Sequence, residues 1–308
     1  MRRRGELSIA ELKVVKGKTS DEEAFEKFYK DCHLRNLRPA TIQYYKDALH
    51  ATKKIVNKQF VDWKEKDVEE FITKSKTLMK ITTINTRLRA LRSFYNFLER
   101  NSLKKENPMK NIKLLRDRQK AIETLENYEI ENLVKTIRKK KTFVSIRDEV
   151  IFLVFLDTGV RLSELVGIEL SDVRENKIVI RQTKNLFERT VYLSDITKEM
   201  IKKYIIIRGE VSTKKLFINQ DNEELKAHSI QTRFTKYGVE AKIEKRVSPH
   251  TFRHTMAKRM IVAGVDAFSL MSLLGHTDIT VTKRYVNLWG KDLEKKHQSF
   301  GALKGLVI

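Results

Sequence analysis

Apolar residues recur at helical spacing through the first third of the chain, with clear interruptions between the runs. This recurrence is typical of four amphipathic helices between Thr19 and Asn101. Ser20 and the acidic run Asp21–Glu23 suit the start of the first helix, because serine caps a first turn and acidic side chains favour the positive end of the helix dipole. The second helix is predicted to start after Pro39 and to carry apolar residues as far as Val56. The third is predicted from Lys66 to about Leu78, and the fourth from Thr82 to Arg100.

The fourth predicted helix, over residues 82–100, has a strongly helical apolar spacing. Its apolar side is formed by Ile84, Leu88, Leu91, Tyr95 and Leu98. Its other faces carry four arginines, which are Arg87, Arg89, Arg92 and Arg100. Guanidinium groups on such a face can contact DNA phosphates. A solvated polar face is the alternative for each of these arginines.

The helical pattern stops at Asn107–Pro108, because the residue before a proline resists the helical conformation. The basic stretch Lys110–Lys120 that follows is typical of an interdomain linker. The sequence therefore predicts two domains joined by a short connection. The predicted segments are a basic extension at 1–17, a helical domain at 18–110, a linker at 111–121 and a second domain at 122–308.

The second domain is predicted to be mainly helical with a small hairpin. A helix starts near Thr124–Tyr128, and the apolar run Ile146–Leu156 predicts a buried helix. Two short runs rich in β-formers, Lys177–Gln182 and Arg189–Leu193, predict strands around a turn. Leu216–Ile218 is a further, brief strand candidate. The fold class is therefore mainly α with a small β-hairpin or sheet.

Composition limits the function classes. The chain has 308 residues, enough for two domains with separate cores, and a net charge of +23. This charge favours a phosphate-rich partner, although a merely soluble basic protein is the alternative. A single cysteine, Cys32, excludes an intrachain disulfide and a cysteine-rich metal site. No apolar stretch suits a signal peptide or membrane span, so we expect a soluble cytoplasmic protein.

Three segments of the second domain contain polar residues that apolar periodicity does not explain. In the first, residues 157–165, a buried helix ends in a glycine turn and a new helix begins. Arg161 then lies near a helix N-terminus, where anions are favoured. A purely structural pair between Arg161 and Glu164 is the alternative for this segment.

The second and third segments contain histidines, an arginine and a tyrosine. His250 and Arg253 stand three residues apart, on one face of a predicted helix. The third segment ends at His276 and is followed nine residues later by Tyr285. Taken singly, these residues also fit a capped helix start, a buried hydrogen-bonded histidine and a core tyrosine. Their conjunction favours a catalytic site.

Together these segments resemble the tyrosine recombinase, or phage integrase, family. The Thr-Gly-x-Arg-x-Ser-Glu-Leu box of that family is matched at Arg161. Its His-x-x-Arg-His-Thr box is matched at His250 and Arg253. Its Leu-Gly-His box ends at His276, and Tyr285 stands at the family's tyrosine spacing. The resemblance covers the whole second domain, which it identifies as a catalytic domain, and the four-helix region resembles the family's SAM-like core-binding domain.

The family also has a catalytic lysine in a hairpin of the form Gly-Lys-Gly-x-Lys-x-Arg. Residues 183–189 occupy the same register, and Lys184 is the match. Asn185 and Phe187 replace a common glycine and a common lysine. Because asparagine tolerates a left-handed turn, we expect the hairpin to form. The resemblance implies that Lys184 protonates the departing 5′ oxygen of DNA.

The resemblance implies a site-specific recombinase that cuts and rejoins DNA through a 3′-phosphotyrosyl intermediate. Tyr285 would be the nucleophile, and Arg161 and Arg253 would stabilise charge on the phosphate. Histidine titrates near neutral pH, so His250 would accept the tyrosine proton and His276 would donate to a phosphate oxygen. The neighbouring His254 is expected to support the site structurally.

The expected partners are double-stranded DNA and further copies of the chain, as a tetramer on paired DNA sites. The apolar C-terminal segment 300–308 would dock on a neighbouring protomer or on its own domain. No cofactor or metal is expected, since the sequence has no P-loop and no carboxylate cluster typical of two-metal nucleases. A DNA-binding regulator built on the same fold is the alternative function, and a topoisomerase is a weaker third.

Overall fold

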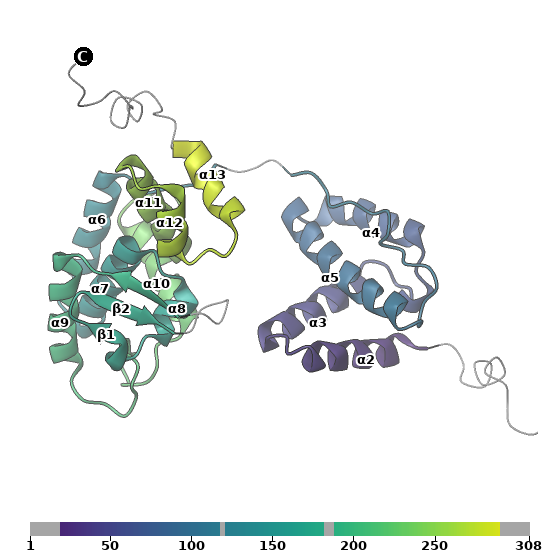
Figure 1. Ribbon diagram of the computed structural model, residues 1–308, viewed down its shortest axis with the longest axis horizontal. Coiled ribbons are helices and arrows are strands. Elements are labelled where there is room, and N and C mark those ends of the chain that lie inside the picture. The colour runs from purple at the N-terminus through teal and green to yellow at the C-terminus, as the bar shows by residue number, and fades with distance from the viewer. Residues whose placement is uncertain (1–18, 118–120, 182–187, 290–308) are drawn as a thin grey trace, which may run out of the picture. The chain divides into compact units, whose positions relative to one another are not determined.

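The computed structural model describes residues 19–117, 121–181 and 188–289, which form two compact units (Figure 1). The division falls between Lys120 and Ala121. Each unit has its own cluster of buried apolar side chains, and each is described separately.

The first unit contains the four predicted helices. Ser20 caps the first of them, because its hydroxyl accepts a hydrogen bond from the backbone N–H of Glu23 at 3.2 Å. The helix after Pro39 is shorter than predicted and ends at Lys53, so Val56 is buried beyond its end. The elements are α2 (Asp21–Leu34), α3 (Pro39–Lys53), the 3-10 helix η1 (Phe60–Asp62), α4 (Glu65–Leu78) and α5 (Ile81–Arg100).

Helix α5 packs against α2, α3 and α4 and supplies much of the first core. Phe94 is fully buried, and its ring lies 5.1 Å from that of Phe25 and 5.4 Å from that of Phe28. Offset and edge-on aromatic pairs of this kind add to the free energy gained by burial alone. The strongly helical spacing of this segment is thus explained by a buried face that contacts three other helices.

The segment after α5 extends the first unit beyond the predicted boundary. The buried amide of Asn85 donates to the carbonyl of Leu115 at 2.9 Å and accepts from its N–H at 2.8 Å. Ile112 and Leu114 pack against the same core. The first residues of the predicted linker 111–121 are therefore held by the first unit, through their apolar side chains and backbone groups.

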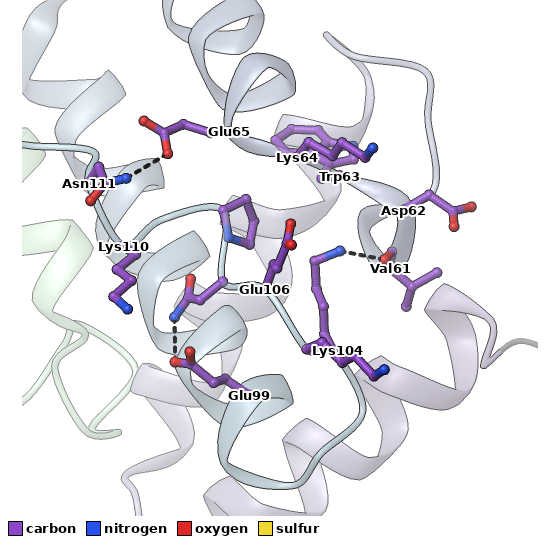
Figure 2. A pocket seen from close by; sticks show the side chains of 13 residues that line it. Val61, Asp62, Trp63, Lys64, Glu65, Glu99, Lys104, Glu106, Lys110 and Asn111 are labelled. Atoms are coloured by element: carbon purple, nitrogen blue, oxygen red, sulfur yellow. Dashed lines mark hydrogen bonds between the residues drawn. The ribbon is translucent and has the colours of Figure 1, made fainter. Parts of the chain in front are cut away.

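A hollow of about 600 Å³ opens beside this segment (Figure 2). Figure 2 shows Lys104 reaching the backbone of Val61. The ammonium group of Lys104 donates a hydrogen bond to the Val61 carbonyl at 2.7 Å. Asn111 likewise donates to Glu65 at 2.9 Å. These two hydrogen bonds tie the segment after α5 to η1 and to α4.

The second unit is built around α7, the apolar helix that was expected to be buried. It packs against α6, α9 and α11, which surround it in Figure 1. The elements of the second unit are α6 (Asn127–Arg138), α7 (Phe143–Thr158), α8 (Leu162–Gly167), η2 (Leu170–Asp172), β1 (Val173–Arg174), β2 (Lys177–Ile180), β3 (Arg189–Tyr192), α9 (Asp195–Arg208), α10 (Ala227–Glu240), α11 (Pro249–Val262), α12 (Ala267–Leu274) and α13 (Ile279–Trp289).

A small antiparallel sheet in the order β1-β2-β3 lies in this unit. The predicted strand pair is confirmed, with Ile178 opposite Val191 and both side chains buried. The two-residue strand β1 was not predicted, because two residues show no alternation. The strand predicted at Leu216–Ile218 is wrong: these residues are buried, but Ile218 forms only an isolated bridge to Glu224.

Phe252 connects this core to the helix that carries the candidate histidines. It lies on α11, is fully buried, and its ring is 5.0 Å from that of Phe152 and 5.1 Å from that of Phe234. Because neighbouring helix positions point about 100° apart, anchoring Phe252 sets the direction of the residues that follow it.

We expect Phe252→Ala to lower the free energy of unfolding by about 3–5 kcal/mol, because a cavity remains among rings that cannot collapse. Phe268→Ala is the control, since Phe268 is 68% exposed and its removal should cost less than about 0.5 kcal/mol. Urea denaturation of the full chain measures both. Equal losses for the two variants would contradict the packing role.

Candidate active site

Two glycine turns form the base of the candidate site. Helix α7 ends at Gly159 with φ of 61°, and α12 ends at Gly275 with φ of 63°. Glycine adopts this left-handed conformation without steric cost, and it ends each helix just before a candidate catalytic residue. A Cβ on Gly159 would stand 3.0 Å from a side-chain carbon of Leu274. The two turns therefore pack closely together.

Arg253 joins these turns from α11. It is 5% exposed, and it donates to the carbonyls of Gly159 and Leu274, the latter at 2.6 Å. It also lies 2.9 Å from Nε2 of His276. Burial, helped by the charge of Arg161, lowers the pKa of Arg253 to about 10. The guanidinium thus stays charged at neutral pH.

Arg161 contacts the same place from the start of α8. It donates to the carbonyl of Gly275 at 3.1 Å and to the carboxylate of Glu164 at 2.9 Å. The structural pair with Glu164 is therefore present, together with a contact to the candidate site. Arg189 of β3 donates to both oxygens of Glu164, at 2.7 and 2.8 Å. Together with Arg253, three guanidinium groups face one carboxylate, which leaves the cluster positive.

The protonation of His276 follows from its neighbours. An arginine can only donate, so Nε2 of His276 accepts from Arg253. Nδ1 must then carry the proton, and it lies 2.9 Å from the hydroxyl oxygen of Thr282. Burial, followed by the charges of Arg253 and Arg161, lowers the pKa of His276 to about 4. The ring is neutral at pH 7. Its Nδ1 proton can be donated to a phosphate only if the hydrogen bond to Thr282 is broken.

Tyr285 lies beside this cluster on α13. It is 5% exposed, and its ring is nearly parallel to those of His276 and Trp289, at 6.3 and 5.7 Å. Burial raises its pKa above 10, against the lowering effect of Arg253. Its hydroxyl lies 2.8 Å from Nδ1 of His254.

The two histidines of α11 differ in their contacts. His250 is more exposed than His254 and makes no hydrogen bond within the described ranges. Partial burial, followed by the charges of Arg253, Arg246 and Arg161, lowers the pKa of His250, so it lies near the same arginines. His254, expected only to support the site, contacts the hydroxyl of Tyr285. The sequence did show two histidines flanking Arg253, but nothing in it indicated which of them faces the tyrosine.

The second unit matches the family described as "Phage integrase family" over residues 123–290, more than half of the chain. The chain belongs to the phage integrase family. Residues 25–105 of the first unit match the N-terminal SAM-like domain of phage integrases. Both parts of the predicted fold class are thus confirmed.

Relatives of this integrase family member carry the tyrosine recombinase name. It is 30% identical to the tyrosine recombinase XerC of Psychromonas ingrahamii, in a match that covers 85% of this chain and 90% of the relative. It is 31% identical to a tyrosine recombinase of Thermosipho africanus, over 89% of this chain and 95% of the relative. The protein is therefore a tyrosine-type recombinase, an enzyme class that breaks and rejoins DNA.

Solved structures show the same fold. The Tn1549 transposon integrase in complex with transposon right end DNA matches with a TM-score of 0.75 and 18% identity, over 91% of this chain and 99% of that one. A lambda integrase dimer bound to a core site matches with a TM-score of 0.74 and 13% identity, over 93% and 83%.

The other residues predicted to act in catalysis or DNA binding are Lys184 and the four arginines of α5. Lys184 lies outside the described residues. On α5, Arg92 donates to the carbonyl of Ile112 at 2.6 Å, and Arg87 is half-buried. Arg100 is paired with Asp31 at 2.9 Å, whereas Arg89 is exposed.

Within residues 19–117, 121–181 and 188–289, no group of three His, Cys, Asp or Glu side chains is arranged to hold a metal ion. In the same ranges, no helix combines the length and apolar character needed to cross a bilayer.

The carboxylate of Glu164 offsets part of the positive charge of Arg161 and Arg189. Burial alone would raise its pKa, but hydrogen bonds from Arg189 and Arg161 outweigh burial and hold the pKa below 4.5. A carboxyl with a depressed folded-state pKa stabilises the fold above its unfolded pKa, and this stabilisation is lost as pH falls through the folded value.

We expect Glu164→Gln to lower the free energy of unfolding by about 3 kcal/mol at neutral pH, because Arg161 and Arg189 lose their counter-charge. The difference from the natural chain should narrow in acid, where Glu164 becomes protonated. Urea denaturation at pH 7 and well below pH 4.5 measures this. A difference that stays constant with pH would contradict it.

Proposed function

We propose that this protein is a site-specific recombinase in which Tyr285 attacks a DNA phosphodiester and becomes joined to the 3′-phosphate. The observation that supports this assignment is a convergence of four side chains on two packed glycine turns. They are Arg161 just before α8, Arg253 on α11, His276 just after α12 and Tyr285 on α13. These residue types supply a nucleophile and fixed positive charge for phosphoryl transfer.

The arginines are suited to the charge that develops on phosphorus during attack. Arg161 and Arg253 now donate to backbone carbonyls at Gly275 and Leu274. Nonbridging phosphate oxygens are stronger acceptors than carbonyls, so a bound phosphate can take over these donors. The site is thus preorganised, with guanidinium groups already held where a phosphate would bind.

The covalent intermediate needs no external energy source. The Tyr285 oxygen forms a bond to phosphorus while the bond from phosphorus to the 5′ oxygen breaks, so one phosphodiester replaces another. A 5′ hydroxyl of a different strand can then reverse the step and rejoin the DNA. We assign protonation of the departing 5′ oxygen to Lys184, on the family match of its hairpin.

We further propose double-stranded DNA as the partner and a tetramer on paired sites as the working assembly. The net charge of +23 supports a phosphate-rich partner. A recombinase named XerH, with a TM-score of 0.71 and 20% identity, is bound to a palindromic DNA substrate in its structure. The helical region at 18–110 would bind DNA, and residues 122–308 would cleave it. We propose that the protein acts in the cytoplasm.

The biological role that we propose is integration and excision of a mobile element or resolution of replicon multimers. A regulator that only binds DNA is not favoured, because such a protein has no use for a tyrosine held against a buried arginine and histidine cluster.

We expect Tyr285→Phe to abolish covalent attachment to DNA while leaving DNA binding intact, since only the nucleophilic oxygen is removed. The substrate is a nicked duplex built on the sequence that the full-length protein selects from random duplexes. Denaturing gels detect the protein–DNA adduct. An adduct that persists in Tyr285→Phe would refute the assignment.

The arginines of α5 should differ in their effect on DNA binding. Arg89→Ala should weaken binding to all sequences and reduce the salt dependence by about one phosphate contact. Arg100→Ala should change less, because Arg100 is already paired with Asp31. Affinity measured across a salt series compares the two, and a larger loss for Arg100→Ala would contradict this ranking.

A further inference from the structure

The hydroxyl of Tyr285 has one hydrogen-bond partner in the described part of the chain, Nδ1 of His254 at 2.8 Å. We infer that His254, and not His250, takes the proton of Tyr285 as its oxygen attacks the DNA phosphate. This inference rests on the proposed function, because it assumes that Tyr285 is the nucleophile.

The contact is built into the packing of the second unit. His254 lies on α11 and Tyr285 on α13, and these helices pack against each other. The two rings are 5.6 Å apart at an angle of 57°, so the imidazole edge points at the hydroxyl rather than stacking on the phenol. Tyr285 is 5% exposed, so little water reaches its oxygen, and the imidazole is the base at hand.

The other basic groups near Tyr285 do not compete for the proton. His276 lies parallel to the tyrosine ring, and both of its nitrogens are engaged, with Arg253 and Thr282. Arginine has no acceptor atom. His250 lies close enough to Arg253 and Arg161 for their charges to lower its pKa, but it has no hydrogen bond to Tyr285 within the described ranges.

The protonation state of His254 fits this role. Burial, followed by the charges of His250, Arg253 and Arg284, lowers the pKa of His254 to about 4. The ring is therefore neutral at pH 7 and has one nitrogen with a free electron pair. Nδ1 accepts from the tyrosine hydroxyl when the ring proton is on Nε2.

A bound phosphate strengthens this base. Burial disfavours a charged His254 most, and the neighbouring charges of His250, Arg253 and Arg284 add to that effect. A DNA phosphate on the arginines brings negative charge beside the ring, which raises the pKa of a histidine. His254 thus becomes a better proton acceptor when the substrate is in place.

The step balances in both directions. During cleavage, the Tyr285 oxygen bonds to phosphorus, the bond to the 5′ oxygen breaks, and the phenol proton moves to Nδ1 of His254. The 5′ oxygen takes a proton from a separate acid, which we assign to Lys184. During rejoining, His254 returns its proton to the departing tyrosine oxygen.

The main test is single-turnover cleavage of the nicked duplex described above, across a pH series, by the full-length protein. His254→Asn keeps an oxygen that can accept the tyrosine hydrogen bond but cannot take its proton. We expect cleavage near pH 7 to fall about 100-fold or more, which is the usual contribution of a general base. The rate should then rise with pH as the tyrosine ionises unaided.

Matched controls separate this role from others. His228→Ala removes an exposed histidine of α10 and should leave cleavage unchanged. If His254→Asn cleaves at the natural rate with the natural pH profile, His254 is not the proton acceptor. If His250→Asn produces the steep pH profile instead, the acceptor is His250, and the inference is overturned.

A measurement on the unaltered protein avoids any effect of substitution on folding. Nitrogen-15 spectra of labelled histidines should show the proton of His254 on Nε2, with Nδ1 unprotonated. The opposite tautomer, in which Nδ1 donates to Tyr285, would overturn the inference.

The outcomes also separate the inference from the proposed function. If the covalent adduct persists in Tyr285→Phe, the function assigned to Tyr285 fails, whatever His254 does. If the adduct is lost in Tyr285→Phe but His254→Asn behaves like the natural protein, the inference alone fails.

Discussion

The buried guanidinium of Arg253 is the interaction on which the rest of the site depends. A charge that is 5% exposed must have partners, and Arg253 finds them in the carbonyls of Gly159 and Leu274 and in His276. These acceptors end helices α7 and α12, so one side chain ties both helices to α11. The same cation then sets the tautomer of His276. Structure and chemistry are therefore coupled, because the donors that hold the turns together are the donors that a phosphate would need.

The site is held in an arrangement suited to protection as well as to reaction. Tyr285 is buried between two rings with its pKa raised, and the arginines are occupied by carbonyls and by Glu164. Under the proposed function, a DNA phosphate would replace the carbonyls as the acceptor of the arginines.

Much of the fold followed from local patterns. The four N-terminal helices, the buried α7 and the strand pair are encoded in apolar spacing and in residues such as Ser20 and Pro39, which act within one turn. Contacts between residues distant in sequence could not be predicted from these patterns. Residues 112–115 lie in the predicted linker, and Asn85, 30 residues away, is hydrogen bonded to Leu115. No local pattern carries that information, because both partners are ordinary polar backbone and amide groups.

The boxes of arginine, histidine and tyrosine, their spacing and the family that they match could all be read from the sequence. Tertiary structure alone decided how these groups meet. Helix α11 leaves His250 more exposed and turns His254 toward Tyr285. The rotation of α11 about its own axis is set by the burial of Phe252 among rings from other elements. Spacing along one helix fixes the angle between two side chains. Which of them faces the nucleophile depends on what the helix packs against.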